Sequence, residues 1–89
     1  MRAIVTVIGK DTVGIIAAVC ALLSDHKVNV LDISQTVLQE YFTMIMLVDA
    51  KASDLPFADL AELLKKEGEA RGLSIRMQRE DIFNAMHRI

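Results

Sequence analysis

Hydrophobic residues in the first third of the chain change from a strand pattern to a helix pattern. Residues 3–8 (AIVTVI) are β-branched and apolar on both faces apart from Thr6, which predicts a strand that is central in its sheet. From about Val13 to about His26 the apolar residues recur at helical spacing, and the expected core stripe is Ile15, Ile16, Val19, Leu22 and Leu23. Residues 9–14 (GKDTVG) interrupt the two patterns, and Asp11 or Thr12 is expected to cap the helix.

The middle of the chain predicts two strands, one with alternating apolar and polar residues and one that is almost entirely apolar. Residues 28–38 alternate, with Leu31, Ile33 and Val37 on one side, which predicts a half-exposed strand at a sheet edge. Residues 39–40 (QE) are the expected turn. Residues 41–48 (YFTMIMLV) are almost entirely apolar and predict a second central strand.

The last third predicts a helix, a strand and a short terminal helix. Ser53 or Asp54 is expected to cap the first of these helices, with Pro56 in its first turn, and Gly72 is expected to end it in a left-handed conformation. Residues 73–78 then alternate as a strand. Asp81 is the expected cap of a C-terminal amphipathic helix with the apolar face Ile82, Phe83, Met86 and Ile89.

The element order is therefore β-α-β-β-α-β with a terminal helix. This order predicts the α+β, ferredoxin-like fold, in which a four-stranded antiparallel sheet carries two helices on one face. Residues 3–79 form the expected domain and residues 80–89 a helical tail. Apolar residues on both sides of the strand at 41–48 leave one sheet face to be covered by the tail or a second subunit, so a homodimer is expected.

Composition narrows the function classes. The 89 residues are 53% hydrophobic but only 4% aromatic, and 10 basic against 12 acidic residues give a net charge of −2. This balance excludes the basic surface of a nucleic-acid binder, and no polybasic membrane patch or apolar run of transmembrane length is present. A single cysteine, Cys20, excludes an internal disulfide and indicates a reducing compartment, so a cytoplasmic location is expected. His26 and His87 lack metal-site spacing, so no metal is expected.

The candidate ligand-binding residues are Lys10, Asp11, Thr12, Gly14 and Ile15, around the start of the first helix, together with Asn29. A helix N-terminus offers unpaired N–H groups to a carboxylate, Asp11 suits an ammonium group, and the Asn29 amide can both donate and accept. Asn29 is expected at the same end of the sheet as the loop. The alternative is that Asp11 only caps, the glycines only shape a turn, and Asn29 only completes a turn.

The strand followed by GKDTVGI at 9–15, a helix and Val28-Asn29-Val30 resembles the ACT domain over roughly residues 3–79. The chain is most similar to stand-alone ACT proteins, and also to the ACT segments of glycine-cleavage regulators and formyltetrahydrofolate deformylases. The resemblance implies a regulatory domain that binds an amino acid or similar ligand at an interface, through Asp11, Gly14, the backbone of Ile15 and Asn29. Gly9 departs from the polar residue that some amino-acid-binding members carry.

The leading hypothesis is thus a small-molecule-binding regulatory module without catalytic residues, metal or cofactor. A structural module that associates with itself or a protein partner and binds no metabolite is the alternative. An acylphosphatase-like enzyme would need an Arg in a glycine-rich phosphate loop, and this loop carries Lys10 instead.

Overall fold

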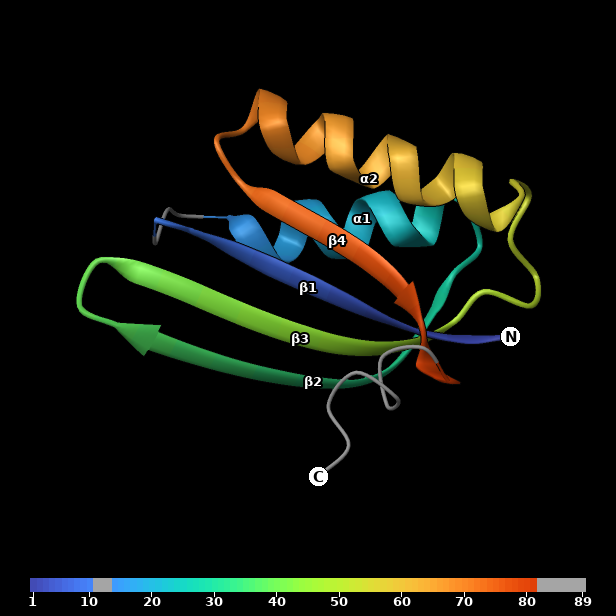
Figure 1. Cartoon of the computed structure of the whole chain (residues 1–89), viewed down its shortest axis with the longest axis horizontal. Helices are drawn as coiled ribbons and strands as arrows, with labels where there is room; N and C mark the ends of the chain where they lie inside the picture. The colour runs from blue at the N-terminus through green and yellow to red at the C-terminus, as the bar shows by residue number, and fades with distance from the viewer. Residues whose placement is uncertain (11–13, 82–89) are drawn as a thin grey trace.

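The computed structural model describes residues 1–10 and 14–81. Its elements follow the predicted β-α-β-β-α-β order: β1 (Arg2–Lys10), α1 (Ile15–Asp25), β2 (Asn29–Leu38), β3 (Tyr41–Asp49), α2 (Phe57–Ala70) and β4 (Ser74–Arg79). The predicted terminal helix falls on residues 82–89, outside the described residues. The strands form one antiparallel sheet in the order β2-β3-β1-β4, so β1 and β3 are central as predicted and β2 is an edge strand. Both helices lie on the same face of the sheet (Figure 1). The ferredoxin-like fold is confirmed.

The core lies between the helices and one face of the sheet. Directly paired strand residues point to the same side, and the buried rows are those that face α1 and α2. These rows are Ala3, Val5 and Val7 of β1, Phe42, Met44, Met46 and Val48 of β3, and Ile75 and Met77 of β4. Ile15, Val19 and Leu23 of α1 and Leu60 and Leu64 of α2 pack against them. The opposite face of the sheet, called here the open face, carries no helix among the described residues.

The first strand is longer than predicted, and Gly9 belongs to it rather than to a turn. Gly9 pairs with Phe42 and therefore points toward the helices. A Cβ atom at this position would collide with the buried side chain of Leu73. Gly9 thus permits close packing of the chain that leads into β4, which local sequence patterns do not reveal.

The start of α1 also differs from the prediction. The helix begins at Ile15, so its N-cap is Gly14 rather than Asp11 or Thr12. Gly14 has a φ of 87°, which favours glycine because a side chain is strained there. Ile16, expected in the core stripe, is 37% exposed, because the buried stripe of α1 is narrower than predicted.

The ends of α2 show one wrong prediction and one confirmed. No side chain caps the helix, because its N-cap is Pro56, directly before the first turn. Ser53 instead accepts a bond from the N–H of Leu55 and donates to its carbonyl oxygen. At the other end Gly72 has the expected left-handed conformation, with a φ of 74°. The N–H of Leu73 then donates to the Gly68 carbonyl at 2.7 Å, which turns the chain into β4.

The edge strand β2 is exposed along almost its whole length. A register shift between Val30 and Asp32 leaves Leu31 at a bulge. The regular alternation that was predicted to put Leu31 on the same side as Ile33 and Val37 is therefore interrupted. Ile33 and Val37 pair with Met46 and Phe42 and so lie on the helix side of the sheet. They remain 40% and 54% exposed. The predicted turn at residues 39–40 is confirmed.

Candidate functional site

The described part of the expected binding loop lies at one end of the sheet. Lys10 ends β1 and pairs with Tyr41 beside the β2–β3 hairpin turn. Gly14 is exposed, and Ile15 is buried as the first residue of α1. Asp11 and Thr12 lie outside the described residues. Lys10, Gly14 and Ile15 therefore lie at the same end of the molecule, which we call the hairpin end.

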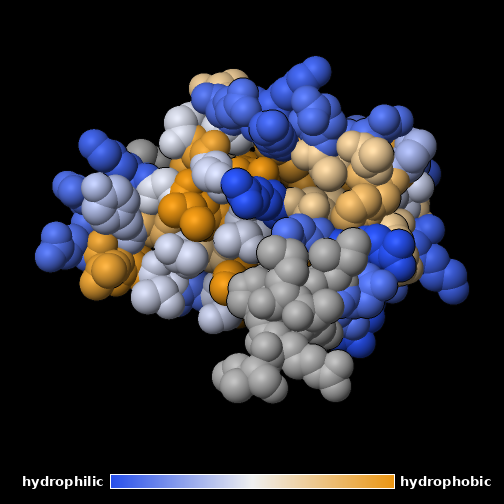
Figure 2. Space-filling view, in the orientation of Figure 1, coloured by the Kyte–Doolittle hydropathy of each residue, from blue (hydrophilic) through white to orange (hydrophobic). Residues whose placement is uncertain are grey.

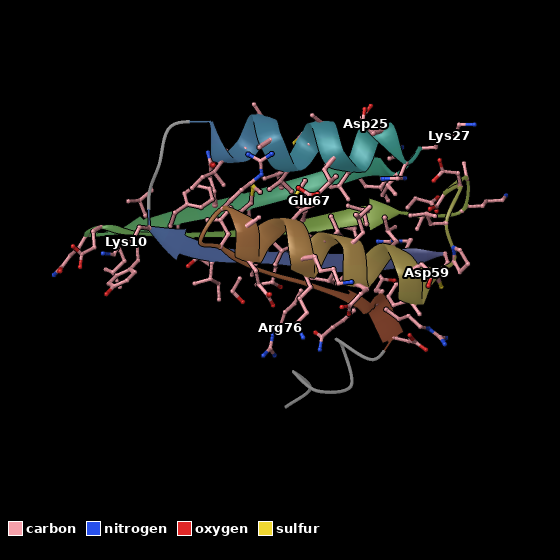
Figure 3. The ribbon with its side chains drawn as sticks, turned by 90° about the horizontal axis from the view of Figure 1, so that it is seen from above. Lys10, Asp25, Lys27, Asp59, Glu67 and Arg76 are labelled. Atoms are coloured by element: carbon pink, nitrogen blue, oxygen red, sulfur yellow. The ribbon has the colours of Figure 1, made fainter. Side chains whose placement is uncertain are left out.

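The prediction that Asn29 shares this end is wrong for a single chain. Asn29 pairs with Asp49, which in turn pairs with Arg2 at the start of β1. Arg2 and Lys10 are the first and last residues of a nine-residue strand. At ~3.3 Å per residue, they are about 26 Å apart along the strand. In Figure 3 Lys10 lies at one end of the molecule, and Lys27, two residues before Asn29, lies at the other. One small ligand cannot bridge that distance.

The hairpin end has the chemistry of an anion site. The first backbone N–H groups of an α-helix have no partner inside the helix and carry the positive end of its dipole. The N-cap of α1 is Gly14, which has no side chain to accept from them, and the first turn contains no acidic residue. The Lys10 ammonium group adds positive charge at the same end. This arrangement suits a carboxylate.

The end that holds Asn29 carries a set of polar contacts that the sequence did not predict. The Asp49 carboxylate accepts from the Lys51 backbone N–H at 2.9 Å and from the N-terminal ammonium of Met1 at 3.2 Å. The backbone bond first, and then the ammonium, hold the pKa of Asp49 below its usual value of 3.8. Aspartate after a strand is common in turns, so no sequence signal separates this residue from an ordinary turn former.

His26 and Asp54 join two loops at this same end. His26 Nδ1 lies 3.0 Å from Asp54 Oδ1, and the Asp54 backbone N–H donates to the His26 carbonyl at 3.4 Å. The contact links the connection from α1 to β2 with the loop that precedes α2. His26 thus has a structural partner, and Asp54 holds the loop rather than capping α2.

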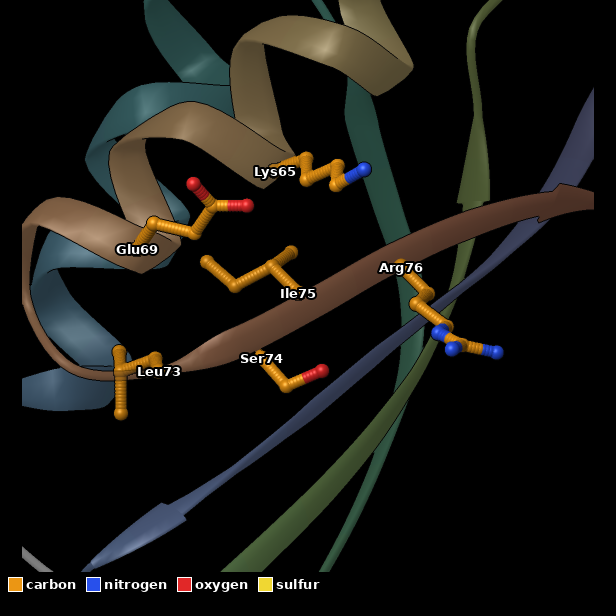
Figure 4. A pocket seen from close by; sticks show the side chains of 6 residues that line it. All are labelled: Lys65, Glu69, Leu73, Ser74, Ile75 and Arg76. Carbon is orange, nitrogen blue, oxygen red and sulfur yellow. The ribbon is translucent and has the colours of Figure 1, made fainter.

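A surface hollow of about 360 Å³ lies between α2 and β4. Figure 4 shows Lys65 and Glu69 extending from α2 on one side of β4, while the Ser74 and Arg76 side chains point away from them. Its remaining lining is Leu73 and Ile75. The polar groups diverge instead of converging on one point, so this hollow lacks the convergent polar groups typical of a binding site.

The described residues contain neither a metal-binding group of side chains nor a membrane-spanning helix. Across residues 1–10 and 14–81, no three His, Cys, Asp or Glu side chains are grouped so that they could hold a metal ion. No helix in the same ranges has the length and apolar character needed to cross a membrane. Cys20 is a free, partly buried thiol that packs against the core.

Comparison with known proteins places this fold in a family. The ACT domain family matches residues 2–78. A UPF0237 protein of Clostridium acetobutylicum is 54% identical over 89 residues, which covers 100% of both chains. An ACT domain protein from Streptococcus pneumoniae of known structure is 40% identical and has a TM-score of 0.82, with 93% of each chain covered.

Two more distant structures share the fold alone. A formyltetrahydrofolate deformylase from Pseudomonas putida is 16% identical, with a TM-score of 0.76, and the match covers 88% of this chain and 28% of that one. A putative glycine cleavage system transcriptional repressor is 23% identical, with a TM-score of 0.72, and the match covers 86% and 44%. Both types of protein were expected from the sequence.

The element order and sheet topology define a small α+β domain of the ferredoxin-like type. The chain belongs to the ACT domain family, whose members are regulatory, small-molecule-binding domains.

Proposed function

We propose that this protein is a stand-alone regulatory domain that binds an amino acid or a related small metabolite between two of its copies. The observation that carries the proposal is the start of α1, where the N-cap Gly14 and an acid-free first turn leave backbone N–H groups for a ligand carboxylate. Asp11 and Thr12 complete this half of the proposed site. The protein has no catalytic role of its own and acts in the cytoplasm, a location that the unpaired Cys20 supports.

The separation of Lys10 and Asn29 within one chain means that the proposed site needs a second copy. Within residues 1–10 and 14–81, β2 pairs with β3 alone, which leaves its other edge without a strand partner. Two such edges pairing antiparallel about a two-fold axis would place Asn29 of one copy level with Leu38 of the other. Leu38 lies at the hairpin end, beside Tyr41 and therefore beside Lys10. Asn29 lies on the open-face side with its pairing partners Asp49 and Arg2, and Lys10 lies on that same side of β1. The Asn29 amide of one copy would then approach Lys10 at the hairpin end of the other.

Exposed apolar side chains along the same edge support this association. Ile33 and Val37 face the helix side of the sheet but are 40% and 54% exposed, and neighbouring Ile16 of α1 is 37% exposed. Burying apolar area of this kind stabilises a subunit contact by ~25 cal/mol per Å². A ligand that binds only the paired arrangement would favour it, and the change in subunit arrangement would pass the signal to a protein partner.

The exposed β2 edge also favours a second candidate function. Its unpaired backbone groups and apolar side chains suit association with another chain whether or not a metabolite is present. The chain would then be a structural or protein-interaction module. The two candidates share the interface and differ only in whether a ligand occupies it.

Thermal unfolding with each of the twenty amino acids separates the two candidates. A ligand at about 100 times its dissociation constant stabilises the folded state by roughly 2.7 kcal/mol, which for a domain of this size raises Tm by on the order of 10 °C. We expect such a rise for one amino acid or a closely related group. If none shifts Tm at 10 mM while the protein remains dimeric, the sensing function is wrong and the interaction module is favoured.

A further inference from the structure

The open face of the sheet exposes its apolar side chains unevenly. Ile4 and Ile8 of β1 and Ile45 of β3 lie on this face, because their neighbours in each strand face the helices. Their exposed fractions are 9% for Ile4, 39% for Ile45 and 47% for Ile8. Ile4 is the member nearest the end where β4 finishes, and Ile8 is the farthest. Figure 2 looks onto this face and shows hydrophobic surface over β1 and β3 among more polar residues.

Glu80, the first residue after β4, lies on the side of the open face. Arg79 pairs with Ala3, whose side chain faces the helices, so Glu80 follows on the opposite side. Arg2, the neighbour of Ala3, also points to the open face, and its Nη2 atom lies 3.0 Å from Glu80 Oε2. Glu80 and Asp81 already have helical backbone conformation. The ion pair therefore joins Glu80 to β1 on the open-face side, two residues from Ile4 in that strand.

The remaining residues 82–89 have the pattern of a helix with one apolar face. Ile82, Phe83, Met86 and Ile89 fall within about 120° of the helix circumference, whereas Asn84, His87 and Arg88 lie opposite. An isolated helix of this length is marginal in water, so an apolar surface must stabilise it if it forms. Its length would be about 12 Å at ~1.5 Å per residue. From the level of Arg2, that length reaches Ile4 and the paired residues Thr6 and Ile45, but stops short of Ile8, about 20 Å away.

We propose that the C-terminal segment 82–89 docks as a helix on the open face of its own sheet, with Ile82, Phe83, Met86 and Ile89 covering Ile4, Leu47 and Ile45. The position of Glu80 on the open-face side, the Arg2–Glu80 ion pair and the reach of eight residues select this occupant over a second copy of the chain. The docked tail closes one end of the face and leaves the β2 edge as the apolar surface for association. This inference does not depend on the proposed ligand.

Isotope-filtered NMR on the full chain tests the docking directly. In a mixture of labelled and unlabelled chains, we expect intramolecular NOEs between the Phe83 ring and the methyl groups of Ile4 and Ile45. NOEs found only between labelled and unlabelled chains would overturn the proposal in favour of a second copy. The absence of any NOE from Phe83 to this face would overturn it as well.

Carboxypeptidase digestion provides a matched pair of variants. Ile45→Lys places a charge beneath the proposed tail and should accelerate release of the C-terminal residues several-fold. Ile8→Lys introduces the same charge on the same face but beyond the reach of the tail, so it should leave the release rate unchanged. Circular dichroism confirms that both variants are folded before digestion. Equal rates for Ile45→Lys, Ile8→Lys and the unchanged protein would contradict the proposal.

Discussion

Gly68 of α2 faces Ile75 of β4 so closely that a Cβ atom on Gly68 would stand 2.8 Å from the Ile75 Cγ1 atom. The same atom would lie 3.0 Å from the backbone carbonyl oxygen of Leu73. Gly68 is buried, and its own carbonyl accepts from the Leu73 N–H, so helix, connection and strand meet at this point. A glycine inside a helix is therefore part of how α2 approaches the sheet.

Gly68→Ala should destabilise the protein although alanine is the better helix former. Helix propensity alone would give a gain of up to ~1 kcal/mol. Overpacking of a tight site costs typically ~1–3 kcal/mol, and here one of the opposing atoms belongs to the backbone, so we expect a net loss of about 1 kcal/mol. Urea denaturation measures the difference. Gly72→Ala is the matched control, because an added Cβ atom there meets no other atom and loses stability only through the left-handed φ of 74°. Gly72→Asn should recover part of that lost stability, because asparagine adopts this conformation more readily than alanine. A more stable Gly68→Ala variant would show that the helix shifts freely.

The lowered pKa of Asp49 predicts how the stability of the folded protein changes in acid. Its pKa is lowered in the folded state, so the unfolded chain binds the proton more readily and folding is favoured while the carboxylate is charged. This contribution is fully present above the usual value of 3.8 and is lost as the pH falls below it toward the folded-state pKa. Asp49→Asn should flatten the fall in Tm below about pH 4. An unchanged acid profile would mean that the contacts to Lys51 and Met1 do not persist in solution.

Val37 tests the proposed association through β2. Val37→Lys places a charge among exposed apolar residues on the helix side of the edge strand, and should raise the dimer dissociation constant at least tenfold, or roughly 1.4 kcal/mol. Sedimentation equilibrium over a range of concentrations gives the constant. Thr36→Lys adds the same charge to the same strand but on the open face, where it should have a much smaller effect. Equal weakening by both variants would point to net charge rather than to this surface.

A complementation experiment tests whether Asn29 and the helix start act across two copies. Asn29→Ala should weaken ligand binding by roughly tenfold or more, because it removes a hydrogen-bonding partner. Gly14→Val should do the same by blocking the approach to the N–H groups of α1. A mixed dimer of the two variants has one site with both changes and one with neither. Calorimetry should therefore recover one site per mixed dimer at the original affinity, which in an equal mixture averages to about half a site per dimer. A site within one chain would recover none.

Much of the fold follows from local patterns. The two-sided apolar runs at residues 3–8 and 41–48 identified the central strands of the sheet. They did not reveal that one face stays open, where Ile8 and Ile45 are exposed. Helix ends were predicted less well. Pro56 precedes α2 rather than standing in its first turn, because Ser53 bonds the neighbouring Leu55 instead of the helix. Such competition between local hydrogen bonds is not visible in residue types.

The candidate site was predicted in its chemistry and misjudged in its placement. The start of α1 offers the expected N–H groups, but Asn29 lies at the opposite end of the sheet. Strand directions explain this: β1 runs toward the loop, α1 returns, and β2 therefore starts where β1 began. The element order already contained this information, whereas the contacts of Asp49 and the pairing of His26 with Asp54 required the folded chain.

The sequence by itself determined the element order, the central strands and the family, because these depend on periodicity and on motifs within a few residues. The tertiary structure decided which apolar residues stay in water and which polar groups meet. Ile33 and Val37 alternate like core residues, yet β2 lies at the sheet edge beyond full cover by α1. Gly9 and Gly68 look like turn or helix-breaking residues, yet both permit close contact with Leu73 and Ile75. These outcomes depend on distances between segments remote in the chain, which only packing sets.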